Sequence, residues 1–376
     1  MGYGLRRASA AAAVFALGVL VLESSNPAAG LSRAPAGVDG DISAALRAIK
    51  ADEARLRAVR LHASYKYSYT QANGKILQGG FVCNAVLEGV PVGKFRLNVL
   101  RQEFGVGNRV EVNSFYAAFN GDIFTHLLTA VNHGGRKWYP LEHGLISTRV
   151  PARAWNYFFY AGWSSTVYGF TTSIPKLPPV LPDFRRMRFS DYLRPGGGPK
   201  WSPTRVIAKW TSRAGVRLLR VRRIGQPLGQ EDFYLDPSKA YAIVYYKHRD
   251  WRVVRGPNGQ LRFLAGGPLV STFRVEQFAE PAPGIFYPRK IVIKGYRKKK
   301  NGGAPVENSR DVLKISHIRV NAKARVRQRQ FVVLFPRDTE VTDESTGKTV
   351  VIGGTPEQQR REIQRDLGKA RAQTGR

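Results

Sequence analysis

The sequence predicts an α+β protein in which one helix precedes a long antiparallel sheet. Apolar residues recur at helical spacing from Asp41 to Arg60, which indicates an amphipathic helix. From His62 onward the hydrophobic period changes to two, as in strands with one buried face. Asn73-Gly74 then supplies a hairpin turn, because Asn and Gly tolerate positive φ. A helix followed by strands that double back on each other is typical of an α+β fold.

The predicted strands form two groups separated by an irregular segment. The first group comprises His62 to Thr70, Ile76 to Leu87, Lys94 to Gln102, Arg109 to Ala118 and Ile123 to Thr129. The second comprises Arg205 to Thr211, Val216 to Ile224, Glu231 to Leu235, Ala240 to Lys247, Pro268 to Ala279, Tyr287 to Tyr296, Asp311 to Val320 and Gln330 to Phe335. After these, residues 337–376 read as a polar C-terminal extension, in which Thr355-Pro356-Glu357-Gln358 predicts the capped start of a helix.

Residues 132–200 break the strand rhythm and read as an insertion packed over one face of the sheet. Their Pro and Gly content opposes regular ladders, and short helices are predicted at Pro151 to Tyr160 and Phe189 to Leu193. The aromatic side chains of this insertion are interpreted either as a core beneath it or as a functional feature, which is a lid over an apolar cavity or a stacking platform for sugar rings. The residues proposed for the lid are Trp155, Tyr157, Phe158, Phe159 and Trp163.

Residues 1–36 read as a secretory signal peptide. Arg6 and Arg7 precede an apolar run of 15 residues from Ala8 to Leu22, and Ala34-Pro35-Ala36 offers small residues for cleavage. Cleavage near Ala29 fits the sequence equally well. The alternative is a membrane anchor that is not cleaved, although the apolar run is shorter than a membrane span of about 20 residues. No cysteine follows the run, so the chain is not itself predicted to be a lipoprotein. We expect a periplasmic or secreted protein.

The charge balance predicts attraction to polyanions. The chain of 376 residues has 60 Lys and Arg against 27 Asp and Glu, a formal charge of +33. Behind a signal peptide the available polyanions are anionic lipid head groups, lipopolysaccharide phosphates and acidic polysaccharides, rather than nucleic acid. An arginine-rich proteome is the alternative explanation. The basic run Arg297-Lys298-Lys299-Lys300 lies at a predicted hairpin tip and is either a solvated turn or a contact for an anionic partner.

Composition and motifs exclude several classes. A hydrophobic content of 43% excludes a disordered chain, and the single cysteine, Cys83, excludes a disulfide scaffold or a cysteine-based zinc site. We expect Cys83 to be a buried small hydrophobe. No phosphate-binding loop, metalloprotease motif or nucleophile elbow occurs, and the six histidines share no metal-like spacing.

Paired carboxylates, as used in glycoside hydrolysis, are the only catalytic groups that the sequence suggests. Nothing in the sequence places two of them at the distance that this chemistry requires. The candidates are Asp122, Glu142, Glu231, Asp232 and Asp236. We therefore predict no enzyme, no catalytic residue, no cofactor and no metal.

Two short stretches carry a resemblance to a known family. Asp232-Phe233-Tyr234-Leu235-Asp236-Pro237 leads into Ala240-Tyr241-Ala242-Ile243, and Phe278-Ala279-Glu280 is followed by Pro283-Gly284-Ile285-Phe286-Tyr287-Pro288. With the helix, meander and insertion, these motifs make the chain resemble the outer-membrane lipoprotein carrier and sorting superfamily. A third stretch, Phe335 to Val341, resembles the end of long bacterial envelope versions.

The resemblance implies a strongly curved antiparallel sheet, or half-barrel, with helices on its concave side. We expect one such domain over residues 37–336. It implies non-catalytic binding of a lipid or lipoprotein acyl chain in an apolar cavity of the envelope. The alternatives are a binder of acidic polysaccharide or anionic head groups through basic hairpins, and a sugar-active enzyme.

Overall fold

The computed structural model describes most of the predicted sheet. It describes residues 36–71, 73–89, 94–106, 109–133, 136–138, 143–147, 189–194, 205–225, 229–298, 303–344, 346–353, 355 and 357–358. They belong to one compact unit, Ala36–Arg376. The predicted signal peptide lies outside this set apart from Ala36. Among these residues no helix is both long enough and apolar enough to cross a membrane.

The first element is α1 (Ala36–Arg55), whose buried Ile42, Ala45 and Ile49 follow helical spacing. The predicted end at Arg60 is wrong, because Ala58 begins a strand. The reason is tertiary: the backbone N–H of Arg57 donates to Oδ1 of Asn321 at 2.8 Å, which directs the chain into the sheet. Helical spacing in the sequence cannot register a partner 264 residues away.

One large sheet contains nearly all the strands. Their bounds are β1 (Ala58–Thr70), β2 (Ile76–Glu88), β3 (Lys94–Val106), β4 (Arg109–Phe119), β5 (Phe124–His133), β6 (Arg136–Trp138), β7 (His143–Ser147), β8 (Arg205–Arg213), β9 (Val216–Gly225), β10 (Gly229–Asp236), β11 (Ala242–Arg249), β14 (Leu269–Ala282), β15 (Ile285–Arg297), β16 (Val306–Val320), β17 (Glu340–Asp343) and β18 (Lys348–Val351). Their order is β18-β17-β7-β5-β4-β3-β2-β1-β16-β15-β14-β11-β10-β9-β8, with β6 beside β5. The α+β class and the antiparallel meander are confirmed, and among the described strands only β17 pairs in parallel, with β7.

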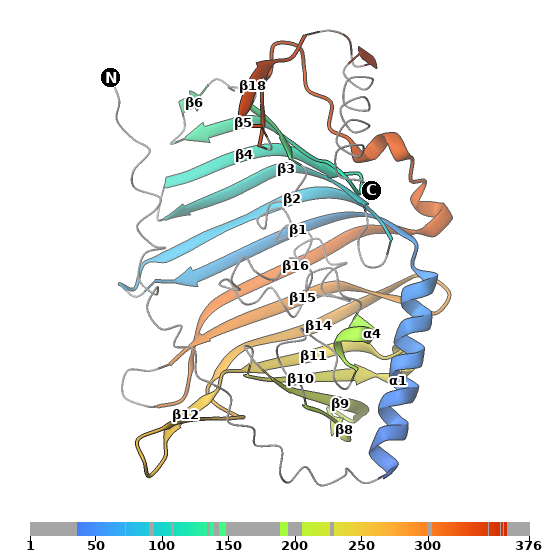
Figure 1. Ribbon diagram of the computed structural model, residues 1–376, viewed down its shortest axis with the longest axis vertical. Coiled ribbons are helices and arrows are strands. Elements are labelled where there is room, and N and C mark those ends of the chain that lie inside the picture. The colour runs from blue at the N-terminus through green and yellow to red at the C-terminus, as the bar shows by residue number, and fades with distance from the viewer. Residues whose placement is uncertain are drawn as a thin grey trace. The chain divides into compact units, whose positions relative to one another are not determined.

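β1 joins two halves of the sheet that are distant in sequence. It pairs with β2 on one side and with β16 on the other, so Val59 faces Val320 and Tyr67 faces Asp311. The strands β1–β7 therefore form one continuous sheet with β8–β11 and β14–β16 (Figure 1). The open order leaves β8 and β18 at the two edges of the described sheet, as expected for a half-barrel rather than two separate sheets.

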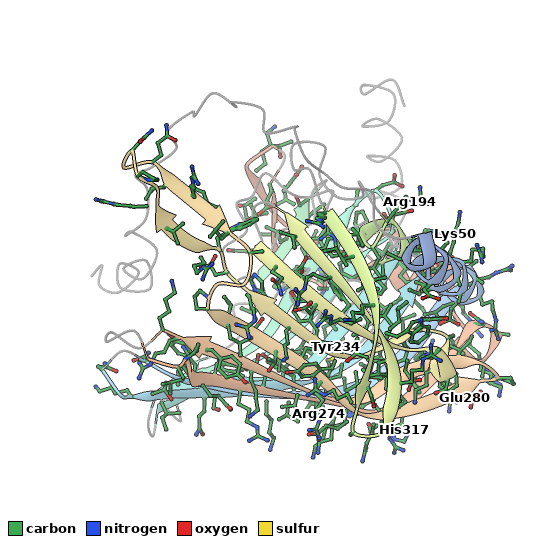
Figure 2. The ribbon with its side chains drawn as sticks, turned by 90° about the horizontal axis from the view of Figure 1, so that it is seen from below. Lys50, Arg194, Tyr234, Arg274, Glu280 and His317 are labelled. Carbon is green, nitrogen blue, oxygen red and sulfur yellow. The ribbon has the colours of Figure 1, made fainter. Side chains whose placement is uncertain are left out.

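The two faces of the sheet differ in chemistry. Along β1, Leu61 and Ala63 are buried, whereas His62 and Ser64 alternate with them and are partly exposed. We call the face of Leu61 the inner face and that of His62 the outer face. α1 and α4 (Phe189–Tyr192) pack on the inner face of the second half (Figure 1). Figure 2 shows Arg274 and His317 on the opposite side of the sheet from Lys50 of α1.

The C-terminal segment differs from the sequence prediction. Gln330 to Phe335 is not a strand: Gln328–Phe331 is a 3₁₀ helix, η4, and the chain then runs extended without a ladder. Phe331, Val333 and Phe335 alternate in burial with the residues between them, which explains the misassignment, but Val333 and Phe335 pack on the outer face near Ala118. The Val333 backbone N–H donates to Oγ1 of Thr125 at 3.0 Å instead of to a neighbouring strand.

Sequence analysis also missed short elements. β12 (Arg252–Arg255) and β13 (Leu261–Leu264) form a separate two-stranded sheet, and β17 and β18 lie in the stretch assigned as a polar extension. Their few residues carry too little periodicity to indicate strands. The predicted helix cap is confirmed: the Thr355 backbone N–H donates to Oε1 of Gln358 at 2.7 Å, and the Gln358 N–H donates to Oγ1 of Thr355 at 3.4 Å.

Asp311, where β16 faces β1, provides a test of the pairing. Burial raises its pKa from 3.8 to about 6, against the opposing hydrogen bond from the Tyr65 hydroxyl at 2.7 Å. Because the pKa is raised in the folded state, the free energy of unfolding falls as the pH rises from about 4 to about 6 and Asp311 ionises. Asp311→Asn should therefore stabilise the protein at pH 7.5, by about 1–3 kcal/mol, and change its stability little at pH 4.

Thermal unfolding of the variant and wild type at both pH values measures this difference. The control is Asp338→Asn, since the Asp338 side chain is 81% exposed. Equal stability of Asp311→Asn and wild type at pH 7.5 would contradict the account.

Candidate functional site

The buried side chains that the structure describes on the inner face of the first half of the sheet are apolar or aromatic, and the partly exposed His126 stacks on Phe124 at their edge. These buried side chains come from β1–β5: Val59, Leu61, Ala63, Tyr65, Phe81, Cys83, Ala85, Leu87, Phe95, Leu97, Val99, Ala117, Phe119 and Phe124. The Phe95 ring lies 5.9 Å from Phe119 and 6.2 Å from Phe124, centroid to centroid. None of these side chains carries a charge at neutral pH, so the surface suits a hydrocarbon partner.

Over the second half, α1 and α4 cover the same inner face. Phe189 of α4 packs on Phe233 of β10, with ring centroids 5.5 Å apart. At the start of α1, Nε1 of Trp210 donates to Oδ2 of Asp41 at 2.7 Å, which ties the helix to β8. The described cover thus lies over β8–β11, while the apolar surface continues over β1–β5.

Two buried carboxylates hold α4 in place. Glu53 of α1 accepts hydrogen bonds from the backbone N–H of Ser190 at 3.1 Å and from its hydroxyl at 2.6 Å. Glu231 of β10 accepts one hydrogen bond from the Tyr192 hydroxyl and one from Nη1 of Arg223 at 2.9 Å. Because a buried charge without partners is costly, these bonds fix α4 between the helix and the sheet.

Tyr246 and Tyr192 complete the cluster around Glu231. The Tyr246 hydroxyl donates to the other carboxylate oxygen at 2.9 Å, and the Arg223 guanidinium lies 3.5 Å from the centre of the Tyr192 ring. Burial, followed by the negative charge of Glu231, raises the pKa of both tyrosines well above 10. Both hydroxyls therefore stay protonated as donors at physiological pH.

Removing one donor from Glu231 should loosen α4. Tyr192→Phe deletes a charge-assisted hydrogen bond and should lower the free energy of unfolding by about 1.5–3 kcal/mol. Urea unfolding measures this change. Tyr69→Phe is the control, because Tyr69 is 41% exposed on β1 and should leave stability within about 0.5 kcal/mol. If Tyr192→Phe were as stable as Tyr69→Phe, the cluster would have no anchoring role.

The candidate carboxylates for sugar chemistry do not form a pair. Glu231 and Asp232 are neighbours on β10 and so point to opposite faces; Glu231 bonds Arg223, and Nε of Arg222 donates to Asp232 at 2.7 Å. Asp236 caps a turn, where its Oδ1 accepts the Ser238 backbone N–H at 3.0 Å. Asp122 lies exposed in another turn, and Glu142 lies outside the described residues.

The predicted cysteine role is confirmed. Cys83 is fully buried on the inner face, and burial raises the pKa of its thiol to about 12. The thiolate is therefore not formed at physiological pH, which makes Cys83 unreactive. Within the described ranges, no group of three His, Cys, Asp or Glu side chains is placed to hold a metal ion.

Most of the predicted binding residues are not placed. Trp155, Tyr157, Phe158, Phe159 and Trp163 lie outside the described residues, as do Lys299 and Lys300. Arg297, the last residue of β15, and Lys298 are described, and both are exposed. The structure thus tests neither the predicted lid nor the role of the basic tip.

Sequence reasoning missed a recess on the outer face where β16, β1, β2 and β3 lie side by side. Its volume is about 630 Å³, and His62, Asn84, Asn98 and Ser316 are among the side chains that line it. His62 lies opposite His317 in the ladder, and their ring centroids are 6.4 Å apart. No motif could indicate this site, because most of its residues come from four strands and meet only through the pairing of β16 with β1, of β1 with β2 and of β2 with β3.

Comparison with known proteins finds likenesses of fold. No protein-family model matches the chain, and no curated protein matches it. Among solved structures, a DUF1329 family protein from Desulfovibrio piger is 9% identical with a TM-score of 0.37, over 83% of this chain and 99% of that one.

Two further matches belong to the superfamily that the sequence resembles. A putative outer membrane lipoprotein-sorting protein domain from Vibrio parahaemolyticus is 9% identical, with a TM-score of 0.35, over 77% of this chain and 97% of that one. A LolA superfamily protein from Nitrosomonas europaea is 10% identical, with a TM-score of 0.35, over 78% and 97%. The function proposed for this chain rests on its own residues.

Proposed function

We propose that this chain is a non-catalytic protein of the bacterial envelope that binds the acyl chain of a lipid or lipoprotein on its inner face. The observation that carries the proposal is the inner face of β1–β5, where none of the described buried side chains is charged and which lies beyond the part of the sheet covered by α1 and α4. A hydrocarbon chain laid on such a surface gains about 0.8 kcal/mol for each buried methylene. Binding of this kind needs no catalytic residue, cofactor or metal.

The aromatic segment is the proposed lid. Trp155, Tyr157, Phe158, Phe159 and Trp163 precede α4 in the sequence, and α4 is anchored on the inner face by Glu53 and Glu231. The chain that follows the aromatic segment is therefore fixed on the inner side of the sheet, at β10. Large aromatic side chains bury much area at low entropic cost, which suits them to enclosing an acyl chain.

The proposed location is the periplasm or the exterior, after removal of the signal peptide. There the partners would be lipids or lipoproteins, and the basic surface would favour membranes with anionic head groups. Membranes there supply acyl chains, and a protein that shields an acyl chain from water lowers the free energy of moving it through the aqueous compartment.

The second candidate is an acidic polysaccharide or an anionic lipid surface bound through the basic hairpin tip, Arg297 to Lys300. The exposure of Arg297 and Lys298 supports it, because exposed cations are free to meet a polyanion. This candidate requires affinity that falls steeply with salt and no bound lipid. Acyl-chain binding predicts the reverse, since burial of hydrocarbon is little affected by moderate salt.

Native mass spectrometry of the full chain, purified gently from a bacterial envelope, tests the proposal. We expect a bound mass that extracts into organic solvent and fragments to acyl chains. Trp155→Ala with Trp163→Ala should weaken acyl-chain binding by about tenfold or more, as expected when aromatic anchors are truncated. Phe263→Ala is the control, because Phe263 is 50% exposed on β13. A bare protein mass, with salt-sensitive retention on an acidic polysaccharide column, would instead favour the second candidate.

A further inference from the structure

The outer-face recess combines five basic side chains with neutral hydrogen-bonding groups. Arg60, Arg96 and Arg319 line it together with His62 and His317, and no Asp or Glu is among the lining residues. Asn84, Asn98, Ser316 and Gln330 add amide and hydroxyl groups. A recess with several guanidinium groups and no carboxylate attracts anions.

The strand register places two like charges opposite each other at this recess: Arg60 faces Arg319 across β1 and β16. Like charges directly opposite in a sheet are destabilising. Elsewhere on the outer face similar pairs have carboxylate partners: Lys294, opposite Arg310, binds Glu307 at 2.6 Å. No ion pair is found for Arg60, Arg96 or Arg319 within the described part of the chain, so an external anion would relieve the repulsion.

Neighbouring groups fix the positions of two arginines and one histidine. Nη2 of Arg60 donates to the carbonyl oxygen of Arg325 at 3.2 Å and to Oε1 of Gln330 at 3.3 Å. The Arg96 guanidinium lies over the Tyr116 ring, 5.8 Å from its centre. Nδ1 of His62 donates to Oδ1 of Asn84 at 2.9 Å. Held side chains lose less entropy when they bind a ligand, so this arrangement is partly preorganised.

The recess has the dimensions of a binding site for a phosphate group. Arg60 of β1 faces Val86 of β2, which in turn faces Arg96 of β3. The backbones at Arg60 and Arg96 are therefore two strand spacings, or about 10 Å, apart. Arginine side chains converge across such a gap on one tetrahedral anion, because each guanidinium offers paired donors to phosphate oxygens. A volume of about 630 Å³ leaves room for a second phosphate or for the remainder of a head group.

We propose that this recess binds a phosphate group, carried either by a free phosphate compound or by the head group of a phospholipid. The site lies on the opposite face of the sheet from the proposed acyl-chain surface. Its occupancy therefore does not depend on the proposed function, and each can be tested without the other.

Calorimetric titration of the full chain with inorganic pyrophosphate tests the site. We expect saturable binding that Arg319→Gln and Arg96→Gln each weaken by about tenfold or more. Arg319 is exposed on β16, so its replacement should leave the fold intact. Arg252→Gln is the matched control: it removes the same charge from the separate β12–β13 sheet and should leave affinity within about twofold. No saturable binding, or an equal loss in Arg252→Gln, would overturn the proposal.

Vesicles identify the source of the phosphate group. Wild type and the same variants are sedimented with phosphatidic acid vesicles and with phosphatidylcholine vesicles. If Arg319→Gln but not Arg252→Gln loses binding to phosphatidic acid, the head group is the ligand. If pyrophosphate binding is lost in Arg319→Gln while vesicle binding is unchanged, the ligand is a free phosphate compound. Both results support the site.

Discussion

The pairing of β1 with β16 is the contact on which the rest of the structure depends. It joins the strands that precede the insertion to those that follow it, across about 250 residues of sequence. Without it, the strands β1–β7 with β17 and β18 would form one sheet and β8–β11 with β14–β16 another, each with a further unpaired edge. The pairing also sets which residues share a face, because a shift of one residue would move every side chain of β1 to the other side.

The register separates two kinds of chemistry on one strand. Leu61 and Ala63 of β1 contribute to an apolar face, while Arg60 and His62 contribute to a basic one. The high net charge of the chain is tolerated because many cations lie on the solvated outer face, away from the core. Among the described charged groups on the inner side, Glu53, Glu231 and Arg223 are buried with partners and hold α4, whereas Asp311 accepts a hydrogen bond from the Tyr65 hydroxyl. The same sheet thus offers one surface to hydrocarbon and another to anions.

Much of the fold was predictable because it depends on local pattern. Alternation over 62–70 and 76–87 predicted two strands, and Asn73-Gly74 predicted the turn between them. The failures have tertiary causes. Arg57 leaves the helix because Asn321 binds its backbone, and Val333 alternates in burial while bonding to a side chain, not to a strand. The candidate sites divide in the same way: the aromatic segment was visible as composition, whereas the recess depends on Arg60, Arg96 and Arg319 meeting through register.

The role of α4 was also beyond sequence reasoning. A helix of four residues has almost no intrinsic stability, so its place depends on Ser190 and Tyr192 meeting carboxylates from two other elements. That anchoring holds α4 on the inner side of β10.

Photo-crosslinking with a fatty acid that carries a diazirine in its chain tests the central claim most directly. After irradiation and proteolysis, mass spectrometry identifies the peptides that carry the label. The account predicts labelled side chains on the inner face of β1–β5, such as Leu97 and Phe119, together with the segment that contains Trp155 and Trp163. Labelling confined to outer-face side chains such as His62 and Asn98 would contradict it.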